Sequence, residues 1–195
     1  MPTRAETKQE TRLKILAAAK AELVENSLLN VSTLEIARRA GVAHGTVFFH
    51  FQNKEALLLE VLDRELLQVT NDLYLRLHGS HDLVEMLHIY LDFLEREEDF
   101  FVVIAREKPF YPPELRRTIL GREAAVRSYF YQALEQGTAL GLYKQVDPGM
   151  ALAFLFATLD DYLRLRQAYV SAGSVIRVKR QALVETFMKF LSTKE

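Results

Sequence analysis

The chain has 195 residues and no cysteine, and 49% of its residues are hydrophobic. This length allows one large domain or two small ones with a well-buried core, while the lack of cysteine excludes disulfides, a thiolate nucleophile and cysteine-type zinc sites. No apolar run reaches the roughly 18 residues that a bilayer-spanning helix needs, and the polar start lacks the apolar centre of a secretion signal. We therefore expect a cytoplasmic protein with no membrane partner.

The net charge of −1 is unevenly divided along the chain. Residues 1–54 contain eight Lys or Arg and five Asp or Glu, a balance of +3, whereas residues 55–195 contain seventeen and twenty-one, a balance of −4. A positive first part would attract nucleic-acid phosphates, and the remainder would weakly repel them. A chance division of this modest size is the alternative.

Apolar residues recur at helical spacing nearly throughout, and glycine and proline are few, so we predict an all-α protein of about nine helices. The first helix is expected over residues 7–25. The second begins at the capping box Ser32-x-x-Glu35, in which each side chain is expected to bond the other residue's amide. This helix should bury Leu34 and end at Gly41, which supplies a left-handed conformation.

Residues 43–50 follow the turn and combine small, polar and aromatic side chains. A helix this short is stable only when it packs on its neighbours, and its mixed side chains suit contact with a partner. Asn53 then caps the next helix. The segment 31–59 therefore predicts two short helices joined by a tight turn and followed at once by another helix.

This segment resembles the helix-turn-helix of the TetR family of transcriptional regulators, whose usual pattern is close to T-x-x-x-I-A-x-x-A-G-V-S-x-G-T-L-Y-x-H-F-x-x-K-E-x-L. The chain departs from the pattern at Ala43, Val47 and Phe48, where serine, leucine and tyrosine are usual. These departures remove one helix cap and one phosphate hydrogen bond. The residues aligned with the pattern, with Ser32 in place of threonine and Phe48 in place of tyrosine, are Ser32, Ile36, Ala37, Ala40, Gly41, Val42, Gly45, Thr46, Phe48, His50, Phe51, Lys54, Glu55 and Leu57.

The resemblance implies a helix-turn-helix DNA-binding domain over residues 1–54 and a larger helical ligand-binding and dimerisation domain over residues 55–195. Specific binding to duplex DNA needs side chains on base edges and flanking groups on phosphates. His50 has an alternative role, because it could brace the short helix by packing together with Phe51. The residues at base-contact positions of the family are His44, Gly45 and Phe49. The residues at its phosphate or sugar positions are Thr33, Thr46, Phe48, His50 and Lys54.

Further along the chain, apolar spacing and stop signals define the remaining helices. The helix after Asn53 should stop at His78-Gly79-Ser80, and prolines 109, 112 and 113 interrupt the helical pattern. Asp147-Pro148 is a helix start, with the aspartate as cap and the proline at the first helical position. Besides the helix that starts there, the expected helices cover residues 53–77, 81–98, 100–107, 113–120, 122–140 and 175–192.

The helix that starts at Pro148 and the last helix are apolar on more than one face. In the TetR resemblance these two helices pack against the same pair of a second subunit, so we predict a homodimer. The alternative is that both apolar faces are buried within one subunit. The predicted interface residues are Leu152, Leu155, Leu159, Tyr162, Leu183, Phe187 and Phe190.

Of the twenty aromatic residues, seventeen follow residue 54, which favours a pocket for a hydrophobic or aromatic effector in the larger domain. The alternative is that these side chains form core, as aromatic residues at helical spacing usually do. The candidate pocket residues are Phe93, Phe100, Phe101, Phe110, Tyr111, Tyr129, Phe130, Phe154 and Asp161.

Two polar features of the larger domain have simple interpretations. Asp160 is expected to pair with Arg164 one turn later, although Asp161 would anchor a polar or cationic ligand group if it faced a pocket. The pair Glu85-x-x-His88 has the spacing of a helical metal motif, but such sites use two motifs and two further glutamates. We therefore predict no metal and no cofactor.

These observations lead to the hypothesis of a ligand-responsive transcriptional regulator. A homodimer would bind a near-palindromic operator in double-stranded DNA, and a small hydrophobic or aromatic molecule would release it. The alternative is a helical enzyme or small-molecule carrier that keeps the first domain as a scaffold, although no nucleophile, base and acid are grouped in the sequence. A repressor and an activator differ only in where the operator lies relative to the promoter, and we favour a repressor.

Overall fold

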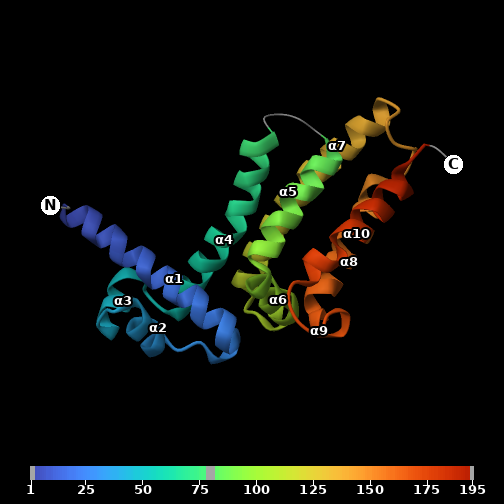
Figure 1. Cartoon of the computed structure of the whole chain (residues 1–195). Helices are drawn as coiled ribbons and strands as arrows, with labels where there is room; N and C mark the ends of the chain where they lie inside the picture. Colours follow the sequence, from blue (N-terminus) through green and yellow to red (C-terminus); the bar gives the residue numbers. More distant parts are fainter. Residues whose placement is uncertain (1–2, 78–81, 194–195) are drawn as a thin grey trace. The chain divides into compact units, whose positions relative to one another are not determined.

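The computed structural model describes residues 3–77 and 82–193, and over these residues the regular elements are all helical, as predicted (Figure 1). This part of the chain forms ten α-helices and one 3-10 turn, where about nine helices were expected. The elements are α1 (Arg4–Asn30), α2 (Thr33–Ala40), α3 (His44–His50), α4 (Lys54–Leu77), α5 (Leu83–Arg96), α6 (Glu98–Glu107), η1 (Lys108–Phe110), α7 (Pro113–Ala139), α8 (Pro148–Arg164), α9 (Arg166–Tyr169) and α10 (Val175–Leu191).

The chain packs as two compact units. Unit 1 comprises Met1–Glu65 with Glu107–Ile119, and unit 2 comprises Leu66–Arg106 with Leu120–Glu195. Helices α4 and α7 contribute residues to both units. These units are defined by packing and not by function. The predicted boundary between the two functional domains, after residue 54, therefore stays a prediction. The expected stop of the fourth helix at residues 78–80 lies outside the described residues.

Helix α1 is longer than expected at both ends. It begins with a complete capping box, in which the Thr3 hydroxyl accepts from the Glu6 amide at 3.2 Å and the Glu6 carboxylate accepts from the Thr3 amide. Near its other end, Ser27 has a φ of 63° and a ψ of 162°, which costs a residue other than glycine roughly 1–3 kcal/mol. The Glu107 carboxylate accepts from the next amide, that of Leu28, at 2.9 Å.

Helix α2 begins and ends where the sequence predicts. The Ser32 hydroxyl accepts from the Glu35 amide at 3.3 Å, and Gly41 is left-handed with a φ of 67°. The Glu35 carboxylate instead accepts from the Arg38 guanidinium at 2.9 Å, because a charge-assisted bond one turn along is stronger than a bond to the Ser32 amide. Leu34 is 63% exposed, so its expected burial was wrong; α2 packs on its neighbours through its central residues.

Unit 1 holds α2 and α4 against α1 by apolar burial and ion pairs. The Lys20 ammonium donates to the Glu65 carboxylate at 2.6 Å, and the Arg39 guanidinium donates to Glu25 at 2.8 Å. These partly exposed pairs orient the helices and add little stability, so burial dominates. The buried apolar residues of α1–α4 and their connections include Ile15, Leu16, Ala19, Leu23, Ile36, Ala37, Val47, Phe51, Leu57, Leu58, Val61 and Leu62.

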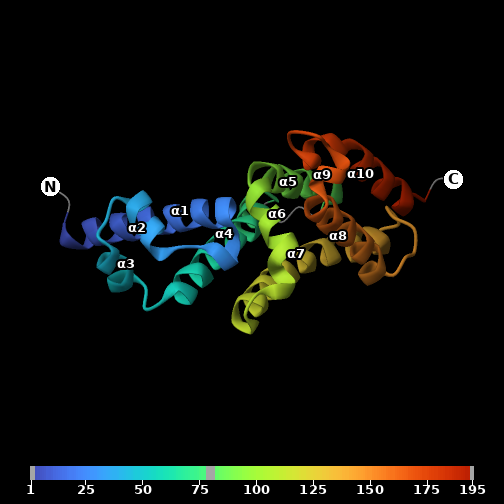
Figure 2. The same ribbon diagram turned by 90° about the horizontal axis from the view of Figure 1, so that it is seen from below.

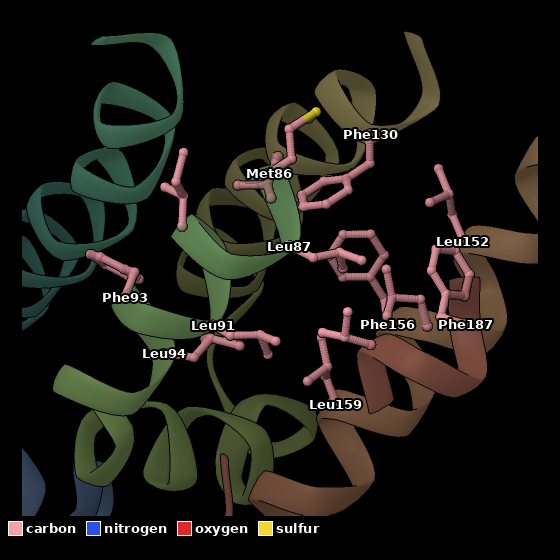
Figure 3. Close-up of a cluster of buried hydrophobic side chains, with 14 of the residues drawn as sticks. Met86, Leu87, Leu91, Phe93, Leu94, Phe130, Leu152, Phe156, Leu159 and Phe187 are labelled. Atoms are coloured by element: carbon pink, nitrogen blue, oxygen red, sulfur yellow. The ribbon is translucent and has the colours of Figure 1, made fainter. Parts of the chain in front are cut away.

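The core of unit 2 is formed mainly by side chains of α5, α7, α8 and α10, and α4 and α6 also contribute to it (Figure 3). Phe130 of α7 and Phe156 of α8 meet edge to face, with ring centroids 5.6 Å apart, and Tyr90 of α5 lies 5.8 and 5.7 Å from them. Edge-to-face contacts add to the stabilisation that burial of these large rings provides. Helices α8 and α10 lie side by side in both views (Figures 1 and 2).

The prolines after α6 interrupt the helical pattern, whereas a glycine within α7 does not. The prolines end α6 and leave the turn η1, as predicted, whereas α7 runs without a break through Gly121, where two helices were expected. A single glycine costs a helix only about 1 kcal/mol, and burial of the flanking Ile119 and Val126 offsets that cost. At Gly137 a Cβ atom would lie 2.2 Å from the ring of Tyr143, so this close approach requires glycine.

The predicted start of α8 is confirmed, because the Asp147 carboxylate accepts from the Met150 amide at 2.6 Å. The helix ends at Arg164, and a kink at Leu165 separates it from the short α9, which ends at Tyr169. Apolar spacing does not mark this kink, because it continues through Leu165.

The start of α10 is capped by a side chain from α6. Glu98 is only 5% exposed, and its carboxylate accepts from the amides of Val175 and Ile176 at 3.0 and 3.2 Å and from the Ser174 hydroxyl. The Arg166 guanidinium lies 3.5 Å from the same carboxylate. The negative charge therefore satisfies free amides at the positive end of α10.

Candidate nucleic-acid interface and helical C-terminal unit

Helix α3 is anchored on one side and displayed on the other. Val47 and Phe51 are buried in unit 1, and the guanidinium carbon of Arg12 lies 4.4 Å from the centre of the Phe51 ring. Phe51 therefore packs, in line with the packing alternative for this residue. The opposite side presents Phe49, which is 71% exposed. The exposed residues of the short helix are His44, Gly45, Phe48 and Phe49.

His44 is held by two neighbours in an outward position. The Thr33 hydroxyl of α2 lies 3.1 Å from Nε2 of His44, so the two groups share a hydrogen bond. The imidazole also meets the Phe48 ring edge to face, with centroids 5.1 Å apart. These contacts bring together three of the residues expected at a DNA contact and orient the His44 ring before any partner is bound.

Gly45 and the residues around it leave the surface of α3 open. A Cβ atom built on Gly45 would meet nothing within 4 Å, so another backbone can approach closely. Thr46 and Lys54 are half-buried, and Lys54 stands beside the start of α4, where the Asn53 side chain accepts from the Ala56 amide at 2.7 Å. A lysine beside a helix N-terminus favours an anion such as phosphate.

His50 differs from the other expected contact residues because it is half-buried. Burial holds its pKa below the ordinary value, and the nearby charges of Lys8 and Arg12 act in the same direction. Both effects favour the neutral imidazole over the charged form. The His50 and Phe49 rings meet edge to face, with centroids 5.4 Å apart and the planes at 88°.

The expected pocket residues do not all gather at one place, although the Phe101 ring contacts the rings of both Phe93 and Phe100. Phe93 and Phe130 are part of the packed core of unit 2, and Phe101 and Tyr129 pack against that core, whereas Phe100 is fully buried. Phe110 and Tyr111 belong to unit 1, the first exposed and the second buried. Phe154 is 58% exposed on α8, since the buried face of that helix is the one that carries Phe156. Most of these aromatic side chains therefore build core or surface.

The expected ion pair of Asp160 with Arg164 is replaced by one that involves Asp161. The Arg164 guanidinium donates to the Asp161 carboxylate at 2.7 Å, and the Tyr169 hydroxyl donates to the same carboxylate. The end of α8 turns Arg164 toward the residue three positions back, and α9 brings Tyr169 to it. The Asp161 carboxylate thus links the end of α8 to α9.

The expected dimer residues fall into two groups. Leu152, Leu155, Leu159 and Phe187 are buried in the core of unit 2 within this single chain. Tyr162 and Leu183 are half-buried, and Phe190 remains exposed. The apolar face that α8 and α10 leave uncovered instead includes Met150, Ala153, Phe154, Ala157, Val178, Ala182 and Phe190.

Within the described part of unit 2, a cavity of about 600 Å³ opens at the end of α7. It is lined by Ala133, Gly137, Leu140, Leu142 and Tyr143, among others, and by none of the expected pocket residues. Over residues 3–77 and 82–193, no cluster of His, Asp and Glu could hold a metal ion, and no helix is both long and apolar enough to cross a membrane.

Comparison with known proteins agrees with this architecture. The model for "Bacterial regulatory proteins, tetR family" matches residues 15–61, and the model for "Tetracyclin repressor-like, C-terminal domain" matches residues 79–164. The fold and the displayed short helix are those of a helix-turn-helix transcriptional regulator. The chain belongs to the TetR family. Proteins of this family are regulators and not enzymes, which decides against the enzyme alternative.

Individual relatives are more distant. The HTH-type transcriptional regulator YvdT of Bacillus subtilis is 35% identical over 107 residues, which is 53% of this chain and 54% of that protein. The chain thus spans about half the length of this relative. The fatty acid metabolism regulator protein of Bacillus subtilis is 24% identical over 159 residues, 79% of this chain and 82% of that protein. The crystal structure of FadR from Bacillus subtilis with stearoyl-CoA has the same fold, with a TM-score of 0.78, 21% identity, and coverage of 92% of this chain and 98% of that one.

Proposed function

We propose that this protein is a repressor that binds a near-palindromic operator as a homodimer and is released by a hydrophobic effector. The observation that carries the DNA-binding part is the outward display of α3, in which His44 and Phe49 are exposed while Val47 and Phe51 anchor the helix. A short helix held in this way can enter the major groove, where side chains distinguish base pairs.

The assignment of single residues rests on their placement and chemistry. The His44 ring can donate to or accept from a base edge, and Phe49 can contact a thymine methyl group. Lys54 and the start of α4 supply positive charge for a phosphate. Base contacts determine sequence preference, whereas phosphate contacts contribute equally on every sequence.

The test of this proposal is selection of DNA by the purified protein. We expect a selected duplex to be retained, with affinity that falls steeply as salt rises, because bound lysine and arginine release counterions. The His44→Ala variant should lose preference among sequences, whereas Lys54→Ala should weaken binding to all of them alike. Failure to retain any duplex at low salt contradicts the function. Equal losses from both variants on every sequence contradict only the roles given to these two residues.

The homodimer is proposed on the uncovered face of α8 and α10. This face carries the large side chains of Met150, Phe154 and Phe190 beside the small Ala153 and Ala157, which allow two helices to approach closely. Exposed apolar side chains gathered on one surface mark a protein interface. A dimer with two-fold symmetry contains two copies of α3, one for each half of a palindrome.

A hydrophobic effector is supported by the apolar and aromatic composition of unit 2, and a long-chain acyl thioester is the first to test because the similar FadR was crystallised with stearoyl-CoA. An effector must prefer the conformation that does not bind DNA. We expect saturating stearoyl-CoA to lower operator affinity by about 5- to 150-fold, the usual range of allosteric coupling. Coenzyme A without an acyl chain is the control. Unchanged affinity with the acylated compound would exclude this ligand class.

A further inference from the structure

A residue of α1 lies beside the most exposed aromatic ring of α3. The ammonium of Lys8 stands over the ring of Phe49, 5.2 Å from its centroid, although the two residues are on different helices. The His50 and Phe49 rings also meet edge to face, with their planes at 88°. The Phe49 ring is therefore contacted by a cation and an aromatic ring even though most of its surface faces solvent.

Phe49 needs such support because core packing does not hold it. A side chain that is 71% exposed on a helix of seven residues samples several rotamers, and each must be restricted before the ring can meet a methyl group in a groove. An ammonium over an aromatic face favours one ring position by about two- to fivefold at an exposed site. The comparable base-contact residue, His44, is held by Thr33 in the same way, through a neighbour on another helix.

We propose that Lys8 is a positioning residue for DNA recognition, which holds the Phe49 ring in the orientation that contacts a thymine methyl group. This role rests on the proposed function of α3. Lys8 acts through Phe49, and the ligand chemistry concerned is the C5 methyl of thymine in the major groove. The competing role, a direct contact of the Lys8 ammonium with a phosphate, is separated from it by the test.

The experiment replaces each thymine of the selected operator with uracil, which removes only the methyl group. Wild-type protein should bind about two- to fivefold more weakly at the thymine that Phe49 contacts. The Lys8→Met variant, which keeps a long apolar side chain without charge, should lose this discrimination, and Lys8→Arg should retain it. The double variant Lys8→Met, Phe49→Leu should distinguish thymine from uracil as well as Phe49→Leu alone does. Lys8 acts through the Phe49 ring, so its loss should have no further effect once that ring is absent.

The salt dependence of binding identifies the alternative. Lys14→Met is the matched control, since Lys14 is another exposed lysine of α1 whose partner is Glu10. We expect Lys8→Met to change the slope of affinity against salt no more than Lys14→Met does. The opposite outcome is a Lys8→Met variant that lowers the slope of log affinity against log salt by about one per half-site and still distinguishes thymine from uracil. That result would assign Lys8 to a phosphate and overturn the proposal. Wild-type protein that binds the operator but senses no thymine methyl would also overturn it, while absence of any DNA binding would instead reject the proposed function.

Discussion

Replacing Phe154 with glutamate is expected to yield a monomer that binds the operator about a hundredfold more weakly than the wild type, or weaker still. Phe154 is 58% exposed and meets Phe190 of α10 edge to face, with ring centroids 6.4 Å apart, on the uncovered apolar face. A two-fold interface there would bury two new carboxylates in an apolar surface, which is costly. Sedimentation at micromolar concentration measures the oligomeric state, and DNA titration measures the affinity.

The matched control is Leu75→Glu. Leu75 is also an exposed apolar residue, but it lies on α4 and outside the α8–α10 face, so this variant should stay dimeric and bind DNA as the wild type does. A Phe154→Glu protein that remains a dimer would place the interface elsewhere. A monomer that keeps full operator affinity would separate dimerisation from DNA binding.

Replacing Glu98 with alanine is expected to lower the free energy of unfolding by about 3 kcal/mol, and the thermal midpoint by about 6–12 °C. The carboxylate is nearly fully buried and accepts from two backbone amides at the start of α10, so its removal leaves these donors without a partner. The Arg166 guanidinium also loses one of its two acidic neighbours and keeps Asp99. Urea unfolding followed by circular dichroism measures the change.

Two further variants define the cause of that loss. Glu98→Gln keeps the shape and one acceptor oxygen, so it should lose clearly less stability than Glu98→Ala. Glu114→Ala removes an exposed glutamate of α7 and should change stability by no more than about 0.5 kcal/mol. If Glu98→Ala cost less than about 1 kcal/mol, water would satisfy the amides and the cap would not determine the position of α10.

The helix boundaries that sequence predicted correctly depend on residues close together in the chain. Ser32, Gly41, Asn53 and Asp147 act on amides or carbonyls within about four positions, so their roles follow from spacing alone. The capping box at Thr3 is of the same kind and could have been found from the pattern Thr3-x-x-Glu6. The family pattern around α3 is equally local, which explains why sequence sufficed to recognise it.

Tertiary packing decided which apolar faces are buried and which are displayed. The sequence of α8 offers Leu152 and Phe154 as equally apolar residues, yet the first lies in the core and the second on the surface, because burial depends on the side from which α5, α7 and α10 approach. Glu98 caps a helix that begins 77 residues later in the chain, and no local sequence pattern predicts such a contact. Local hydrogen bonding therefore determined where most helices begin and end, whereas only the packed structure, through contacts between distant residues, decided which surfaces face a partner.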